Sequence, residues 1–312
     1  MGMVIGCDVS KRHIDVQVLG AAAGSRRAQI ANCEGPIRRW VAQLPPGCRV
    51  GMEATGTLHE LLARVLVQAG HTVYVLNPRW VYAYRRALGV RGKTDLVDAM
   101  LIARYIQEHA AHLHPYRVPT PEQAELRRLL LRRLELQKLM SATRQSLAAQ
   151  AQAVLKQFKV LLREIERRIA ALLAANPEWR ALGGRLRGIP GVGSIVGAHL
   201  VQVLTRIAFG NTEAFVAHTG TDPRPNDSGT KRGRRRLTHH GDAGLRHMLF
   251  MAAMAASKRP EWRALYQHQR AKGLASTAAL IVLARKIARI AFQLFKTGGT
   301  YDPTRLGGAQ PA

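Results

Sequence analysis

The sequence predicts an α/β domain followed by a mainly helical region, an α/β plus α fold. Short apolar or alternating runs of strand length occupy residues 3–9, 13–20 and 26–33, with turn residues between them. Helical and strand-like segments then alternate as far as residue 77. The segment 122–174 contains neither glycine nor proline and carries leucines at helical spacing, which predicts long helices.

The first part of the chain is predicted to form a mixed sheet. Its three opening runs are short and separated by turn signals, which predicts a three-stranded antiparallel meander. Residues 36–44 and 58–70 have a helical period, and residues 49–55 and 71–77 have the apolar character of buried strands. Helices that alternate with strands after a meander favour a mixed α/β sheet with helices on its faces.

The rest of the chain divides at changes of composition. The glycine-free and proline-free segment is predicted to form two long helices or a coiled-coil hairpin, serving as a packed spacer or an oligomer contact. A third region, rich in alanine, glycine and arginine, is predicted to be mostly helical, and the last dozen residues are predicted to be disordered. The expected divisions are residues 1–118, 119–178, 179–302 and a flexible tail, 303–312.

The charge balance predicts that nucleic acid is the partner. Lys and Arg number 47 against 20 Asp and Glu, a net charge of +27. So much like charge opposes a compact state, and a polyanion relieves the repulsion while it releases counterions. The sequence has neither a long uncharged apolar run nor a basic amphipathic anchor, so no membrane partner is expected.

The cysteines indicate the compartment. Cys7, Cys33 and Cys48 form no CxxC pair and have no zinc spacing, so we expect reduced core thiols. The chain start has no charged segment before an apolar stretch, so no secretory signal is expected. The expected location is the bacterial cytoplasm, in association with the nucleoid.

A set of acidic residues is the first candidate for chemistry. Asp8 and Glu53 end two predicted strands, and Asp95 and Asp98 lie three residues apart at a predicted helix start, so the last two share a helix face. Converging carboxylates would suit one or two Mg²⁺ ions, which stabilise the attacking and leaving oxygens of a phosphodiester displacement. In the alternative interpretation, the helix pair only favours the helix N-terminus electrostatically and Asp8 is a turn residue.

The second candidate is a serine in a basic loop. Ser228 is followed by Gly229 and then by a basic run. Its hydroxyl could attack a phosphate while the cations stabilise the developing charge. A disordered loop that only contacts DNA explains the same residues. The basic side chains are Lys231, Arg232, Arg234, Arg235 and Arg236.

The third candidate is the turn Ile189-Pro190-Gly191-Val192-Gly193, which is of the helix–hairpin–helix type. Glycines in such a turn let backbone N–H groups approach a phosphate at a helix start, and they grip the backbone without reading sequence. A helix–helix corner without a ligand is the alternative.

In combination, these pieces resemble the DEDD transposases of bacterial insertion sequences, the family that includes the Piv and MooV DNA invertases and bridge-RNA-guided recombinases. The resemblance covers nearly the whole chain, and the ordered combination is more specific than any one motif. It rests on GCDVSKRHIDVQVL, MEATGTLHELLARVLVQAGHTVYVLNP, KTDLVDAMLIARY, IPGVGSIVGAHL, SGTKRGRRRLTHHGDAGLRHMLFMAA and ALIVLARKIARIAFQLFKTGGTYD.

The resemblance implies roles for particular residues. The four acids of the family fall on Asp8, Glu53, Asp95 and Asp98, in a domain that resembles the RuvC/RNase H fold, and the nucleophilic serine falls on Ser228. It implies Mg²⁺, with Mn²⁺ as a substitute, and a phosphoserine link to DNA that a free 3′-hydroxyl later reverses. Nucleic-acid contacts are expected at Lys93, Gly191, Gly193 and the basic run after the serine.

The resemblance also implies partners. These are donor and target DNA, a structured guide RNA that chooses sequence by base pairing, and a homotetramer built from dimers. The expected function is therefore an RNA-guided transposase or recombinase. Two alternatives stay open at this point: a RuvC-like Holliday-junction endonuclease, which needs the four acids but not the serine, and a non-catalytic nucleic-acid-binding protein.

Overall fold

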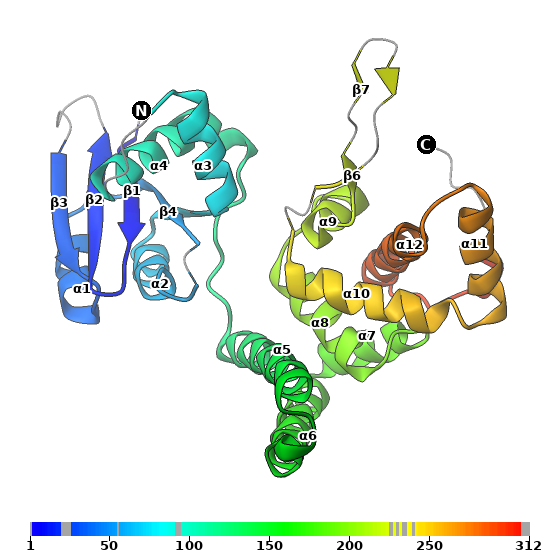
Figure 1. The fold of residues 1–312 in the computed structure, drawn as a ribbon. Helices are drawn as coiled ribbons and strands as arrows, with labels where there is room; N and C mark the ends of the chain where they lie inside the picture. The colour runs from blue at the N-terminus through cyan, green and yellow to red at the C-terminus, as the bar shows by residue number, and fades with distance from the viewer. Residues whose placement is uncertain are drawn as a thin grey trace. The chain divides into compact units, whose positions relative to one another are not determined.

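A computed structural model of the chain describes residues 2–19, 26–54, 56–90, 95–224, 227–228, 231–232, 236–238 and 241–306. The chain divides into two compact units, Met1–Val118 and Pro119–Ala312. Figure 1 shows a sheet with helices in the first unit and mainly helices in the second. The predicted α/β class of the first part is confirmed.

The first unit is built on a five-stranded sheet in the order β3-β2-β1-β4-β5. The first three strands form the predicted antiparallel meander, and the last two are parallel to β1 and to each other. The strands are β1 (Val4–Val9), β2 (His13–Leu19), β3 (Arg26–Ala31), β4 (Arg49–Glu53) and β5 (Thr72–Leu76).

Helices cover both faces of this sheet (Figure 1). One face is apolar: Ile5, Cys7 and Val16 are fully buried in one cluster with side chains of α1 and α2. The other face packs against α3 and α4, through a cluster that includes Tyr74 and Ile102. The helices are α1 (Glu34–Val41), α2 (Glu60–Gln68), α3 (Pro78–Ala87) and α4 (Asp95–His109), followed by the 3-10 turn η1 (Ala110–His112).

Two of the three cysteines are core thiols, as the sequence predicted. Cys7 and Cys48 are buried, but Cys33 is exposed, because it precedes α1 in the connection from β3. Burial raises the pKa of the Cys7 thiol, and the neighbouring Asp8 carboxylate raises it further. This thiol is therefore protonated and unreactive at neutral pH.

Helix α4 lies unusually close to the sheet, because two strand residues under it have no side chain. A Cβ atom added to Gly6 would stand 2.0 Å from the Ala99 carbonyl oxygen and 2.5 Å from the Ala103 nitrogen. A Cβ atom on Gly51 would stand 2.9 Å from methyl carbons of Ile102 and Ile106. The glycines of β1 and β4 therefore set the distance between α4 and the strands.

The second unit is mainly helical. Its helices are α5 (Pro121–Leu147), α6 (Gln152–Ala175), α7 (Pro177–Arg187), α8 (Ser194–Arg206), α9 (Thr212–Thr219), α10 (Ala243–Ala256), α11 (Pro260–Ala271) and α12 (Ser276–Thr297), with the 3-10 turns η2 (Ala148–Ala151) and η3 (Pro303–Leu306). Four two-residue strands lie between α9 and α10: β6 (Pro223–Arg224), β7 (Asp227–Ser228), β8 (Lys231–Arg232) and β9 (Arg236–Leu237).

Helices α5 and α6 form the long-helix pair that the sequence predicted, and they pack on each other. Their supercoiling stays a prediction. Leu126, Leu130 and Ile169 from this pair share one core with Trp179 and Phe215 from later helices. Segment 119–178 is thus packed into the second unit along part of its length.

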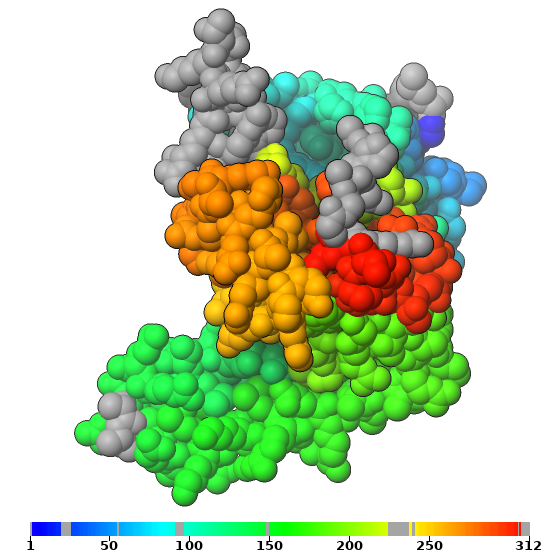
Figure 2. All heavy atoms as spheres, turned by 90° about the vertical axis from the view of Figure 1, so that its right-hand side faces the viewer, coloured from blue at the N-terminus to red at the C-terminus, as the bar shows by residue number. Residues whose placement is uncertain are grey.

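The predicted flexible tail is partly wrong. Residues 303–306 form η3, and Leu306 is only 5% exposed in the helical core. The Trp262 indole N–H donates to the Tyr301 hydroxyl at 3.1 Å, and the Lys286 ammonium donates to the Leu306 carbonyl. Figure 2 shows the last described residues, in red, packed on the helical unit. Residues 307–312 lie outside the described part.

The core of the second unit holds a histidine that should make stability depend on pH. Burial lowers the pKa of His199 to about 4, mainly by desolvation, with Arg133 and His247 adding to the effect against Asp242. The unfolded chain therefore binds more protons between about pH 6.5 and pH 4, so stability falls as pH falls through this window, by about 3 kcal/mol in total. Denaturant titrations across that range measure the loss.

The matched variant is His199→Gln, which keeps a polar side chain without the titration. Its free energy of unfolding should vary less between pH 7 and pH 4 than that of the wild type. Equal pH dependence in both proteins would contradict the assignment to His199. His218, whose pKa is also lowered by burial, contributes to both curves alike, so the difference between them isolates His199.

Candidate active site and nucleic-acid interface

The acidic residues of the two central strands lie side by side. In the parallel register Cys7 pairs with Met52, so the next residues, Asp8 and Glu53, stand level at the ends of β1 and β4. Neighbouring strands are about 4.8 Å apart. Because side chains alternate along a strand, Asp8 and Glu53 project to the same face as Gly6 and Gly51, the face that α4 covers.

The first turn of α4 lies over this pair of strand ends. Ala99 and Ala103 lie above Gly6. Ala103 also clusters with Val4, which lies further back along β1. Helix α4 therefore runs against the direction of β1, and its start lies towards Asp8. This start is the segment that carries Asp98.

Asp98 is held by an arginine from the neighbouring helix. Its Oδ1 accepts a hydrogen bond from Arg85 Nη2, and the side chains are 17% and 14% exposed, respectively. Arg85 belongs to α3, which directly follows β5. The arginine neutralises one carboxylate of the candidate site.

The structure adds a carboxylate that the sequence analysis missed. Asp15 in β2 pairs with Asp8 across the antiparallel ladder, so both face α4. It is 4% exposed, its Oδ1 accepts a hydrogen bond from Gln29 Nε2 at 2.9 Å, and its Oδ2 lies 3.3 Å from His13 Nε2. The alternation of polar and apolar residues in β2 was the available signal. Gln29, Asp15, Asp8 and Glu53 thus form one polar row across four strands.

The donor set suits a hard divalent cation, since carboxylate oxygens are the ligands that Mg²⁺ prefers. Within the described ranges, no three His, Cys, Asp or Glu side chains are placed as a ready group of metal ligands. The side chain of Asp95 lies outside those ranges, although α4 begins at this residue. Asp98 would have to exchange Arg85 for a cation. The strand ends bring Asp8 and Glu53 together. The start of α4 carries the other two acidic residues of the predicted site, Asp95 and Asp98.

Ser228 lies in a β-hairpin and not in an irregular loop. Asp227 pairs with Arg232 and Ser228 with Lys231, which leaves two residues between the strands. Strands β6 and β9 form a second antiparallel pair nearer the helices (Figure 1). Arg234, Arg235 and Lys93 lie outside the described residues, as do the side chains of Ser228, Lys231, Arg232 and Arg236.

The base of this hairpin is anchored in the helical unit. The Thr238 hydroxyl donates to Asp222 Oδ1 at 2.6 Å, and the Thr238 amide donates to the Asp222 carbonyl at 3.2 Å. Arg285 Nε from α12 donates to the Thr221 carbonyl at 3.1 Å. Burial is the main cause that lowers the pKa of Arg285. The strand that leads to Ser228 therefore starts from a fixed point.

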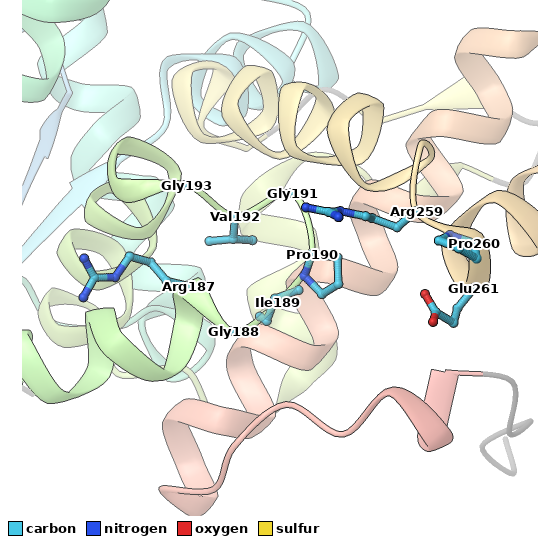
Figure 3. Close-up of a pocket in the computed structure, with 10 residues that line it drawn as sticks. All are labelled: Arg187, Gly188, Ile189, Pro190, Gly191, Val192, Gly193, Arg259, Pro260 and Glu261. Atoms are coloured by element: carbon cyan, nitrogen blue, oxygen red, sulfur yellow. The ribbon is translucent and has the colours of Figure 1, made fainter.

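The predicted helix–hairpin–helix turn connects α7 and α8 and borders an open pocket of about 700 Å³ (Figure 3). In Figure 3 the Arg259 side chain extends towards the turn at Gly191. The pocket also lies against the start of α11 at Pro260. Its lining consists of Arg187, Gly188, Ile189, Pro190, Gly191, Val192, Gly193, Arg259, Pro260 and Glu261.

The two glycines singled out in this turn have different surroundings. Gly191 has φ +84°, and an added Cβ atom would stand 2.1 Å from the Ala252 carbonyl oxygen of α10. Gly191 is therefore required for helix packing. Gly193 is the N-cap of α8, and nothing lies within 4 Å of an added Cβ atom. Of the two, Gly193 offers the open backbone that a phosphate needs.

Sequence comparisons define the class. Residues 5–164 match the IS110-type DEDD family described as "Transposase", and residues 183–267 match the "Transposase IS116/IS110/IS902 family". The protein is thus a transposase, an enzyme class that acts on DNA by recombination. The chain belongs to the IS110 transposase family, which confirms the resemblance noted in the sequence.

Curated relatives agree with this class. The pilin gene-inverting protein of Moraxella bovis is 26% identical over 262 residues, which cover 80% of this chain and 81% of the relative. An uncharacterized 43.6 kDa protein of insertion element IS110 from Streptomyces coelicolor is 31% identical over 169 residues, 54% of this chain and 40% of the relative. Among the helices described here, none has the length and apolar character needed to cross a membrane.

Proposed function

We propose that this transposase cleaves, exchanges and rejoins DNA strands through a covalent phosphoserine intermediate at Ser228. The observation that carries the proposal is that one chain contains both a polar, carboxylate-lined strand edge, in the first unit, and a basic hairpin with a serine, in the second unit. Family membership supports recombination of DNA, and the fixed base of the hairpin supports a role that needs positioning. We assign the first unit to the RuvC/RNase H type on its meander and alternating helices.

The proposed covalent step is a transesterification. Ser228 Oγ attacks the scissile phosphorus and loses its proton to water, while the bond from phosphorus to the 3′-oxygen breaks. The 3′-oxygen takes up a proton, so one strand ends in a 3′-hydroxyl and the other end is joined to the serine as a phosphodiester. A 3′-hydroxyl from the exchanged strand then attacks that diester and releases the serine. No net oxidation or hydrolysis occurs, so the bond energy is retained.

The carboxylates fit a metal role in this proposal. Asp8, Glu53, Asp95 and Asp98 would hold Mg²⁺, or Mn²⁺, since level strand ends and a helix start supply only oxygen ligands. The bound cation would stabilise negative charge on the phosphoryl oxygens. Asp98 pairs with Arg85, which would have to give way to the cation. Asp15 adds buried negative charge next to Asp8 and strengthens the attraction for a cation.

The basic residues and the long helices have supporting roles in the proposal. Lys93, Gly191, Gly193 and the basic residues of the hairpin, Lys231 included, hold phosphates without reading sequence. A structured guide RNA selects the DNA sequence by base pairing.

The long helices favour a contact between subunits. Leu139, Val160 and Leu161 on α5 and α6 are exposed apolar side chains, as expected for a tetramer. Light scattering with and without RNA measures the subunit number, and an unchanged monomer would refute the tetramer.

The test is to trap the intermediate. The full chain is incubated with its flanking RNA, donor and target DNA and Mg²⁺, denatured, and digested, and the modified peptide is sequenced. We expect a DNA adduct on Ser228 that forms only with Mg²⁺. Ser228→Ala should lose the adduct and strand joining by at least about a thousandfold, because the nucleophile is absent.

A matched control is Ser257→Ala, which removes a half-buried hydroxyl that donates to the Met254 carbonyl at 2.9 Å. It should form the adduct at the wild-type rate. Cleavage that persists in Ser228→Ala would overturn the serine mechanism and favour an endonuclease that uses water. Binding without any DNA product in the wild type would favour a non-catalytic role.

A further inference from the structure

The exposed aromatic side chains of the first unit gather on one helix. Among its described residues, the large apolar side chains with substantial exposure are Trp80 (41%), Tyr82 (62%) and Leu88 (44%). All three belong to α3 or its C-cap. An exposed aromatic ring loses the benefit of burial, and Tyr82 has the largest exposed fraction of the three.

The outward face of α3 combines the Tyr82 ring with cations. Val81 is the buried side chain of this helix. Arg79, Tyr82 and Arg86 are exposed and follow each other at spacings of three and four residues, so they share a face. Tyr82 thus has one arginine a turn before it and one a turn after it. We call Arg79, Tyr82 and Arg86 the α3 surface.

A second tyrosine of α3, Tyr84, has a structural role, because it contacts α4. The Tyr84 hydroxyl donates to Glu108 Oε2 at 2.8 Å, and its ring packs edge-on against Tyr105 with centroids 5.3 Å apart. Burial is the main cause that raises the pKa of Tyr84 to about 12, and Glu108 contributes. Tyr84 therefore fixes α3 to α4. Tyr82, two residues away, projects to the other side.

The sequence of α3 and of the residues that follow it carries one sign of charge. Between Pro78 and Thr94 the chain has five cations and no acidic residue: Arg79, Arg85, Arg86, Arg91 and Lys93. A purely apolar partner would gain nothing from this charge, and a duplex offers no open base face to Tyr82. A single strand offers both a phosphate backbone for the arginines and an unstacked base for the Tyr82 ring.

We propose that the α3 surface binds an unpaired segment of nucleic acid, with Tyr82 stacked on a base and Arg79 and Arg86 on the flanking phosphates. The inner side of the same helix binds Asp98 through Arg85. A strand held on α3 therefore lies beside the carboxylate edge. The inference rests on the proposed function, in which exchange exposes single strands.

The test measures binding alone, so that its failure and failure of the strand chemistry are distinguishable. Full-length protein in EDTA is titrated against a fluorescent single-stranded DNA, the same sequence as RNA, and the DNA duplex. Tyr82→Ala should weaken binding of a single strand about 5- to 100-fold and leave duplex binding within about twofold. Tyr82→Phe should bind as the wild type does, because the ring is retained.

The charge component has its own variant and control. Arg79→Gln with Arg86→Gln should reduce the slope of log affinity against log salt by about 1.4 for a single strand. Arg38→Gln on α1 removes an exposed cation that pairs with Glu34 on the other side of the sheet, and it should leave both strand types unaffected. A strand carrying 5-iodouracil should crosslink to the peptide that contains Tyr82.

The outcomes separate the sources of the strand and the rival partner. If Tyr82→Ala loses affinity for single-stranded DNA alone, for RNA alone or for both, the result identifies the bound strand and supports the site. Unchanged single-strand affinity in Tyr82→Ala, or equal loss for duplex and single strand, would overturn the proposal. A change of subunit number in Tyr82→Ala with normal strand binding would also overturn it and assign the α3 surface to a protein contact.

Discussion

Replacing Asp8 by asparagine is expected to abolish strand joining while DNA binding survives. The carboxylate of Asp8 stands level with that of Glu53 at the strand ends, and the amide keeps its size but loses the charge that would attract a cation. Loss of metal stabilisation costs several kcal/mol at the transition state, so joining should fall by at least about a thousandfold. Glu53→Gln should behave in the same way.

The measurement is a single-turnover joining assay at a series of Mg²⁺ and Mn²⁺ concentrations, with affinity for DNA measured in parallel. Glu34→Gln is the matched control, since Glu34 is an exposed acid bound to Arg38 on α1. It should join strands at the wild-type rate. Strand joining by Asp8→Asn at a rate near that of the wild type would refute metal chemistry at this edge.

The second large effect is expected from Gly6→Ala, which tests how the site is built. A Cβ atom at this position would stand 2.0 Å from the Ala99 carbonyl oxygen and 2.5 Å from the Ala103 nitrogen. Both are backbone atoms of α4, so the helix must move as a whole. We expect a loss of about 3 kcal/mol of stability or more, and loss of joining, because the shift carries Asp98 away from Asp8.

Chemical denaturation measures the stability of the variant, and circular dichroism shows whether the fold survives. Gly35→Ala is the matched control: it lies in α1, with only the tip of Arg39 within 4 Å of an added Cβ atom. Alanine is the better helix former, so this variant should be unchanged or up to about 1 kcal/mol more stable. Equal behaviour of the two glycine variants would contradict the close approach of α4.

Much of the first unit could be predicted because its signals are local. The alternation in residues 13–20 and the apolar run of residues 3–9 predicted the strands. In a strand, successive side chains point to opposite faces of the sheet. The same period contains Asp15, but an aspartate in a strand has no special meaning until the register is known. Asp8 and Glu53 stand level because β1 and β4 pair in parallel. The sequence could not show this pairing, since the two residues are 45 positions apart.

The features that the sequence did not reveal depend on contacts between distant segments. The composition of residues 301–312 predicted disorder, but burial of Leu306 and the bond between Trp262 and Tyr301 are made with distant helices. Gly191 was assigned to phosphate binding, since glycine in a turn suits a close ligand. Phosphate binding at Gly191 stays a prediction, and the structure adds that a Cβ atom there would meet the carbonyl oxygen of Ala252, a contact that only the packing of α10 creates.

The sequence by itself determined the strands, the long helices, the excess of positive charge and the transposase family. These properties depend on periodicity, composition and the order of motifs, which can be recognised in the sequence without the three-dimensional structure. The tertiary structure decided which acids stand side by side, that Arg85 binds Asp98, and which turn glycine is open. Those facts depend on register and on the approach of helices, and both result from packing between segments remote along the chain.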